Sequence, residues 1–436
     1  MIKELQMKFK NILFLLVVTM LTIFVLAGCP DNPVNQPVEE PDYAPELGNG
    51  ANVTIPAWTV TKGAKEGLSP VDLSGRKSNV NAALLDAVKN PGTFFDGKAK
   101  KNVILFIGNG ISAELIAESE EKYGELLFND FASNKAAVSN SDGTTPDACA
   151  IATSLFCGVT TKNGYLGLDK DGKAVDPFFK VIDDKMKKPY TKGLISNGDV
   201  ADPFISGVYY QANSLENKAP IYEKIFKPGA KVPSIVIGKG DFSEVCAPGG
   251  PYATNEIYKQ HRYYSKDFID CAGAIEGERL FTESGHPDVK SNPSAIVSEL
   301  SGNFGRYDTN GGTLPNFEQL VAFGITYLDK KNDFKKVGMG IGLVINDTAV
   351  EEYIKADNKE AALKQIQNFD EGIAVAARFA FDDPDTLIIV TSGYVADKNG
   401  IKNESVPVYA FGAGADFINA ENFTMEDVGK FLCSLQ

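Results

Sequence analysis

The chain has 436 residues, of which 43% are hydrophobic and 23% are charged, a balance typical of a globular protein with a large core. Its formal net charge of −14 arises from 57 Asp and Glu against 43 Lys and Arg, and so acidic a surface disfavours nucleic acid as a partner because both are negative. Only two histidines occur, His261 and His286, and the six cysteines form no Cys-x-x-Cys pair, which argues against a structural zinc or redox motif.

The N-terminus has the pattern of an export signal. Three lysines in the first ten residues precede an almost wholly apolar run at residues 12–26, which is short for a membrane-spanning helix. Residues 26–29, Leu-Ala-Gly-Cys, match the bacterial lipobox, in which cleavage precedes a cysteine that is then lipidated. The alternative is an ordinary membrane anchor, or a signal cleaved elsewhere nearby. We expect residues 1–28 to be a lipoprotein signal peptide, and Cys29 to anchor the protein in the cell envelope, either in the periplasm or on the outer surface.

A proline-rich segment follows the predicted lipidation site. Prolines recur at nearly every fourth position between residues 30 and 45, and large apolar residues are few. This composition is typical of a solvated, semi-rigid tether. We assign residues 29–50 to the tether and residues 51–436 to one folded domain.

Export also bears on the remaining cysteines. With Cys29 lipidated, five thiols are left, and Cys246 and Cys271 flank a loop-rich segment. We expect these two to form a disulfide if the compartment is oxidising, although spacing alone does not prove the pairing.

From residue 100 onward, apolar strands alternate with helical patterns. The expected strands are residues 102–107, 193–196, 233–238, 338–346, 387–391 and 406–411, and the expected helices begin near residues 112, 146, 178, 316, 357 and 425. The helix near residue 357 is expected to open with a capping box of Asp357 and Glu360. This order predicts an α/β, three-layer sandwich in which a mostly parallel sheet has helices on both faces. Residues 197–312 are looser, with a composition typical of insertions.

Several of these segments resemble motifs of the alkaline phosphatase family. Residues 101–111 resemble the family's first motif, a strand that ends in Gly-Asp-Gly-Met, and here the strand ends in Gly-Asn-Gly-Ile. Residues 145–154, Thr-Pro-Asp-Ala-Cys-Ala-Ile-Ala-Thr-Ser, resemble its nucleophile motif, Pro-Asp-Ser-Ala-Gly-Thr-Ala-Thr-Ala, and residues 157–159 repeat its Cys-Gly-Val. Residues 369–391 and 406–415 resemble the segments around its last metal ligands. Because the matches are collinear, the resemblance implies the alkaline phosphatase fold.

The resemblance also implies a particular chemistry. In the family, two zinc ions and one magnesium ion are held by carboxylates and histidines around a serine at a helix N-terminus. Zinc lowers the pKa of the serine and stabilises the leaving oxygen, while an arginine pairs with the other phosphate oxygens.

The positions that carry this chemistry differ in this chain. The metal-bridging aspartate of the first motif is Asn109, whose amide has no charge, and the nucleophilic serine is Ala148. At another position that supplies metal ligands in the family, Asp202 keeps a carboxylate, but the hydroxyl that the family has there is lost. Thr-Ala-Asp-His of the family becomes Thr-Ser-Gly393-Tyr394, the arginine aligns near Leu215, and the last zinc histidine aligns near Ile401. The family's Met-Val-Glu falls on Leu-Val-Ile at residues 343–345. Because the zinc sites need three histidines and this chain has two, we expect the zinc and magnesium sites to be lost and no cofactor to bind.

Some residues allow a second interpretation. Cys149, beside the lost serine, is either a relocated nucleophile or a small buried helix residue, and we favour the second because one helical step turns a side chain by about 100°. Asp202 is interpreted as a turn residue before Pro203. Six tyrosines could form a recognition surface or pack insertions onto the domain, and both interpretations stay open: Tyr209, Tyr210, Tyr252, Tyr258, Tyr263 and Tyr264.

These observations predict a membrane-anchored lipoprotein on an alkaline phosphatase fold that is catalytically inactive. Its role would be structural or the binding of a protein partner or small ligand. One alternative is a divergent phosphatase or other hydrolase with a relocated nucleophile or metal site. A second is a solute-binding lipoprotein, which would need two similar lobes around a cleft.

Overall fold

The computed structural model describes residues 80–98, 100–185, 191–226, 235–239, 269–270, 340–435 and most of 317–329. The chain divides into two compact units, Met1–Glu46 and Leu47–Gln436, and every described residue belongs to the second. The predicted signal peptide, tether and lipidation site therefore lie outside the described residues. So do both histidines, four of the six tyrosines (Tyr252, Tyr258, Tyr263 and Tyr264), and the predicted pair Cys246 and Cys271. Among the residues described, no helix is both long and apolar enough to cross a membrane.

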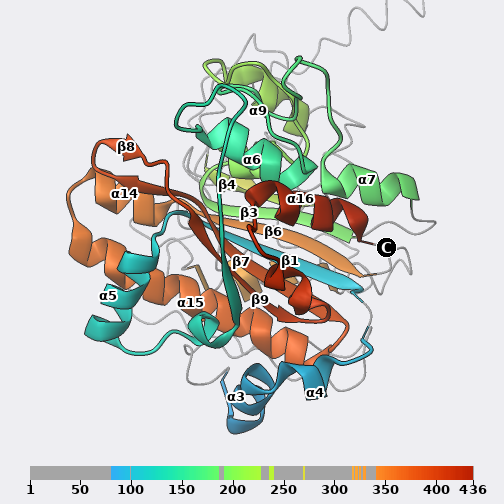
Figure 1. Cartoon of the computed structure of the whole chain (residues 1–436), viewed down its shortest axis with the longest axis vertical. Coiled ribbons are helices and arrows are strands. Elements are labelled where there is room, and N and C mark those ends of the chain that lie inside the picture. The colour runs from blue at the N-terminus through green and yellow to red at the C-terminus, as the bar shows by residue number, and fades with distance from the viewer. Residues whose placement is uncertain are drawn as a thin grey trace, which may run out of the picture. The chain divides into compact units, whose positions relative to one another are not determined.

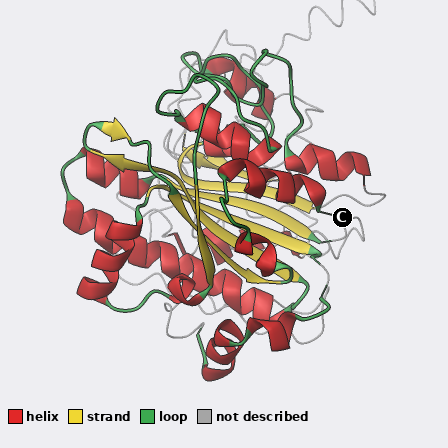
Figure 2. Ribbon diagram, in the orientation of Figure 1, coloured by secondary structure: helices red, strands yellow, loops and turns green. Residues whose placement is uncertain are grey.

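A nine-stranded sheet runs through the described part of the domain (Figure 2). Along the sheet the strands follow the order β2-β9-β7-β1-β6-β3-β4-β5, and β8 pairs with the end of β7. The strands are β1 (Asn102–Gly110), β2 (Ala132–Ala136), β3 (Thr191–Asp199), β4 (Ile235–Lys239), β5 (Ile269–Asp270), β6 (Ile341–Asp347), β7 (Thr386–Asp397), β8 (Gly400–Ile401) and β9 (Val406–Gly412).

The centre of the sheet is parallel. β1 pairs in parallel with β6 on one side and β7 on the other, so that Leu105 lies opposite Val344 and Ile389. All nine residues of β1 are buried, as expected for a continuous apolar strand covered on both faces. β3 adds to β6 and β4 to β3 in parallel, while the pairings β7–β9, β2–β9, β4–β5 and β7–β8 are antiparallel. The prediction of a mostly parallel sheet is confirmed.

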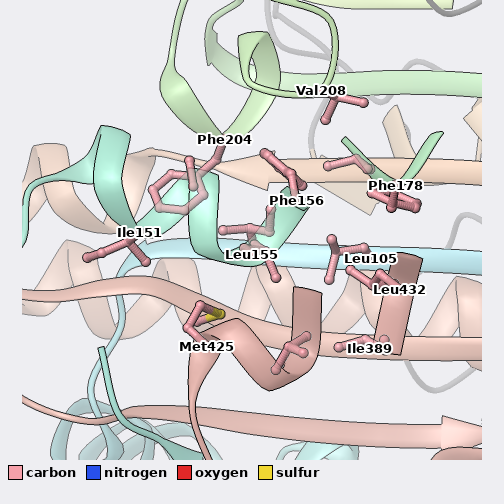
Figure 3. Packing of buried hydrophobic residues seen from close by; sticks show 14 of the residues in the cluster. Leu105, Ile151, Leu155, Phe156, Phe178, Phe204, Val208, Ile389, Met425 and Leu432 are labelled. Carbon is pink, nitrogen blue, oxygen red and sulfur yellow. The ribbon is translucent and has the colours of Figure 1, made fainter. Parts of the chain in front are cut away.

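Helices cover both faces of this sheet (Figure 1). One face packs against α3 (Ala82–Lys89), α4 (Pro91–Phe95), α5 (Ala113–Tyr123), η1 (Leu127–Asp130), α14 (Ala349–Lys355) and α15 (Lys359–Asp382). The other face packs against α6 (Ala148–Cys157), α7 (Phe178–Lys185), α8 (Pro203–Ser206), α9 (Ala219–Phe226), η2 (Ala415–Asn419) and α16 (Met425–Ser434). We call the apolar cluster between the sheet and this second group of helices the second core. Figure 3 shows it: Leu105 and Ile389 of the sheet meet Leu155, Phe156 and Leu432 of the helices.

The start of α15 differs from the prediction. Asn358, not Asp357, is its N-cap, and the Asn358 side chain accepts a hydrogen bond from the backbone N–H of Ala361. Asp357 has a φ of 56°, in the left-handed region that ends one helix rather than beginning the next. The residue therefore belongs to the turn between α14 and α15.

Candidate functional site

Polar residues gather where the parallel strands β1, β3, β6 and β7 end. In register, Ile107 of β1 lies opposite Asn346 of β6, and Gly108 lies opposite Ser392 of β7. Asn109 therefore follows at the carboxyl end of the sheet, beside Asn346 and Gly393. This edge is where open α/β sheets place their ligands.

Asn109 is completely buried and contacts two of the other predicted site residues. Its Nδ2 donates to Oδ2 of Asp202 at 3.3 Å, while its Oδ1 is buried and has no hydrogen-bond partner. Gly393 lies against the same amide: a Cβ atom there would come within 2.6 Å of Asn109 Oδ1 and 2.7 Å of the Phe204 ring. The structure thus brings Asn109, Asp202 and Gly393 together, with no room for a side chain at residue 393.

Asp202 is the centre of this arrangement. One carboxylate oxygen, Oδ1, accepts from the backbone N–H of Phe204 at 2.8 Å and from Nδ2 of Asn346 at 3.1 Å. Asp202 is thereby the N-cap of α8, which refines its interpretation as a turn residue before Pro203. We name Asn109, Asp202 and Asn346 the amide–carboxylate cluster.

The environment of Asp202 raises the pKa of its carboxyl. Burial, together with the negative charges of Glu351 and Asp199, raises the pKa of this carboxyl to about 7, although the hydrogen bond from the Phe204 N–H and the charge of Lys218 act in the opposite direction. Lys218 itself is paired with Asp199 at 2.6 Å. The Asp202 carboxyl therefore holds its proton to a higher pH than an exposed aspartate does.

Tyr394 packs against Phe204, with ring centroids 6.0 Å apart. It is buried, and burial raises the pKa of its phenol, as do the nearby charges of Glu351 and Asp202. The phenol and Glu351 form a hydrogen bond, and Glu351 is also paired with Lys355 at 2.5 Å. Tyr394 is therefore a neutral hydrogen-bond donor at physiological pH.

Ala148 is the first residue of α6, and its small side chain is partly buried against the second core. The carboxylate of Asp147 caps this helix, because its Oδ1 accepts from the backbone N–H of Ala150 at 2.8 Å. The other oxygen of Asp147 accepts from the N–H of Gly164 at 2.6 Å. A negative side chain thus already occupies the helix end, where an anion would bind.

Cys149 is the second residue of α6, and its side chain is buried. Burial raises the pKa of its thiol to about 12, and the charges of Asp147 and Asp202 add to the effect. Only the thiolate is a strong nucleophile, so this thiol is unreactive at neutral pH. The geometry supports the interpretation of Cys149 as a buried helix residue.

The donor set at the strand ends fits neither zinc nor magnesium. Across the described residues, no group of three or more His, Cys, Asp or Glu is placed to hold a metal ion. Both oxygens of Asp202 already accept from N–H groups, and Asn109 and Asn346 are neutral amides that turn their nitrogens toward it. Zinc favours thiolate, imidazole and carboxylate ligands, and magnesium is usually bound through carboxylates.

Three contributors to this site were not singled out from the sequence. Asn346 stood at the end of a predicted strand, where a polar residue after an apolar run is a signal for the carboxyl edge. Glu351 and Lys355 lie on α14, a seven-residue helix that the sequence pattern did not predict. Leu215 and Ile401, aligned with family ligands, pack partly against the second core and contribute no polar group.

Comparison with known proteins identifies the relatives of this chain. A family model described as alkaline phosphatase matches residues 100–223. Alkaline phosphatase 4 of Bacillus subtilis is 22% identical over 323 residues, which cover 70% of this chain and 64% of that protein. The repressible alkaline phosphatase of Saccharomyces cerevisiae is 22% identical over 321 residues, covering 68% and 55%. The chain thus spans less than two thirds of the length of these two curated relatives.

Solved structures show the same fold. The alkaline phosphatase from the Antarctic bacterium TAB5 superposes with a TM-score of 0.58 at 18% identity, covering 78% of this chain and 98% of that one. The alkaline phosphatase of Thermus thermophilus gives a TM-score of 0.54 at 13% identity, covering 82% and 95%. The fold expected from the collinear motifs is confirmed.

Proposed function

Since the chain belongs to the alkaline phosphatase family, we propose that it is a lipid-anchored member that has kept the fold and lost the metal-dependent hydrolysis. Its role is then structural or the binding of a partner protein or small ligand. The observation that carries this proposal is the amide–carboxylate cluster, in which two neutral amides donate to the remaining carboxylate.

The charges around the cluster support the same proposal. Asp147, Asp199 and Glu351 all raise the pKa of neighbouring groups, so the local potential is negative. The two lysines nearby are engaged, Lys218 by Asp199 and Lys355 by Glu351. A phosphate monoester is itself negatively charged and would be repelled here. Catalysis of its hydrolysis would also need cationic groups that stabilise the developing negative charge.

We expect the purified protein to hydrolyse p-nitrophenyl phosphate no faster than background, with zinc and magnesium present. The variant Ala148→Ser should not gain activity, because its hydroxyl would keep an ordinary high pKa without a metal beside it. The double variant Asn109→Asp, Ala148→Ser should also stay at background, since a catalytic unit is not restored by parts. Alkaline phosphatase 4 of Bacillus subtilis, assayed in parallel, is the positive control.

The competing function is hydrolysis, which the names of the relatives suggest for this chain as well. Metal-dependent turnover by the wild-type protein that disappears in Cys149→Ala would establish it, with the relocated thiol as nucleophile. Metal analysis of the same preparation separates the two functions, because an inactive member should hold no stoichiometric zinc.

Anchoring is tested separately. We expect Cys29→Ser to abolish labelling by a radioactive fatty acid and to leave an uncleaved precursor, because the thiol is the acylated group. Each buried methylene contributes about 0.8 kcal/mol, so a doubly or triply acylated wild-type protein should stay with membranes in alkaline carbonate washes. Acyl labelling that persists in Cys29→Ser would refute the lipobox interpretation, and Cys246→Ser serves as the matched control.

A solute-binding role has less support. Such a receptor needs two similar lobes, whereas the described residues form one sheet with a single apolar core on each face. The binding or structural role therefore remains the proposal.

A further inference from the structure

The helices α6 and α16 pack side by side on one face of the sheet at very close range (Figure 1). The contact is made by two glycines: a Cβ atom at Gly429 would lie 2.8 Å from the Cα of Gly158 and 2.6 Å from its nitrogen. Glycine at both positions lets the two backbones touch. Side chains next to this crossing therefore lie close to the opposite helix.

One cysteine of each helix lies beside this crossing. Cys157 is the last residue of α6, directly before Gly158, and Cys433 is one helical turn after Gly429. The Sγ of Cys433 lies 3.6 Å from the carbonyl oxygen of Phe156, whose carbon is bonded to the nitrogen of Cys157. Cys433 is also among the groups that raise the pKa of the Cys157 thiol. Both are free and partly exposed, whereas Cys149 is buried.

We propose that Cys157 and Cys433 form a disulfide that ties the C-terminal helix α16 to α6. The inference rests on the glycine-mediated crossing and the placement of both thiols beside it. It is independent of whether the protein hydrolyses phosphate. It complements the pair expected from the sequence, Cys246 and Cys271, which lies outside the described residues.

The two thiols have different roles in forming the bond. Lys185 donates to the backbone carbonyl of Cys433 at 2.8 Å, and its positive charge opposes the burial that raises the pKa of Cys433 to about 11. The pKa of Cys157 is raised by burial, by Cys433 and by Asp176, and no positive charge opposes this rise. The thiolate of Cys433 is thus the first to attack.

The reaction is a thiol–disulfide exchange with a disulfide oxidant such as oxidised glutathione. Cys433 attacks one sulfur of the oxidant, a mixed disulfide forms, and the first glutathione leaves as a thiol. Cys157 then attacks the Cys433 sulfur of the mixed disulfide and releases the second glutathione. The protein loses two electrons and two protons, and the oxidant is reduced to two thiols.

The test is peptide mapping by mass spectrometry of the detergent-solubilised full chain, after incubation with oxidised glutathione and alkylation of the remaining thiols. We expect a peptide that contains Cys157 linked to the peptide that contains Cys433. The rate of linkage should rise about tenfold per pH unit between pH 7 and 9, because thiolate is the attacking species.

Two variants report the order of attack. Cys157→Ser should accumulate a glutathione adduct on Cys433, because the resolving thiol is absent, and Cys433→Ser should leave Cys157 mostly unmodified. Cys149→Ser is the control and should form the linkage normally. The proposal is overturned if Cys157 and Cys433 both remain free to alkylation in the oxidised wild type, or if either pairs with another cysteine. The wild-type measurement decides the matter even if a variant fails to fold.

Discussion

Replacing Gly429 by alanine is expected to lower the free energy of unfolding by about 3 kcal/mol, the upper part of the range for overpacked positions. The added Cβ would overlap the carbonyl oxygen of Ser154 and the backbone of Gly158. Backbone atoms of a helix cannot turn aside as a flexible side chain does. The helix α16 would have to move away from α6, and Leu432 would lose contacts with the core (Figure 3).

Chemical denaturation of the variant and the wild type measures this change. The matched control is Gly92→Ala in α4, where a new Cβ would meet no atom within 4 Å and φ is not positive. Alanine has the higher helix propensity, so the control should be neutral or up to about 1 kcal/mol more stable. Equal stability of Gly429→Ala and wild type would show that the two helices do not cross as closely as described.

The central sheet was predictable from the sequence because its strands are nearly continuous apolar runs. The run at residues 102–107 had to be buried on both faces, and a parallel strand between two helical layers satisfies that requirement. β2 was not predicted, because its residues, Ala-Ser-Asn-Lys-Ala, form an edge strand with exposed alternate positions and no apolar run. Its pairing with β9 comes from tertiary contacts rather than from local preference.

The site was predictable in part, and for a different reason. Asn109, Ala148, Gly393 and Tyr394 were found because each stands in a segment that still matches a family motif at some of its other positions. The hydrogen bond of Asn346 to Asp202 joins two segments that are far apart in the sequence. The ion pair of Glu351 with Lys355 lies on a helix that was not predicted. No local pattern records which way an amide turns, so the amide–carboxylate cluster could be seen only in three dimensions.

The variant Asp202→Asn is expected to be more stable than the wild type above pH 7 by about 2–4 kcal/mol, an order of magnitude taken from the shift in pKa. The pKa of Asp202 is raised from 3.8 to about 7 in the folded protein. The folded state therefore holds this proton more tightly than the unfolded chain. Well below pH 3.8 both states are protonated and the residue costs nothing. Between about pH 4 and pH 7 the unfolded chain ionises while the native carboxyl keeps its proton, so the stability of the native state falls as the pH rises through this window. Above about pH 7 both states are ionised and the loss is complete.

An asparagine removes that loss, because it never ionises. It also keeps the helix cap, since asparagine and aspartate are about equally good N-caps, and its Oδ1 can still accept from the N–H of Phe204 and from Asn346. Its Nδ2 would face the Nδ2 of Asn109, two donors in contact. Rotating the Asn109 amide by half a turn resolves this conflict, because its Oδ1, now buried without a partner, would accept the new N–H.

Denaturation at a series of pH values from 4 to 8 tests the prediction as a difference between variant and wild type, so that titrating groups common to both cancel. The difference should be near zero or negative at pH 4, rise by up to about 1.4 kcal/mol per pH unit, and level off above pH 7. Asp382→Asn is the matched control: that carboxylate is paired with Arg378 at 3.0 Å and is not among the groups that shift the pKa of Asp202, so removing its charge should give no stabilisation at pH 8. A difference for Asp202→Asn that stays constant across this range would mean that Asp202 is ionised throughout in the native protein. The cluster would then hold a full negative charge, to which a cation could bind, and the metal-free site proposed for this chain would have to be abandoned.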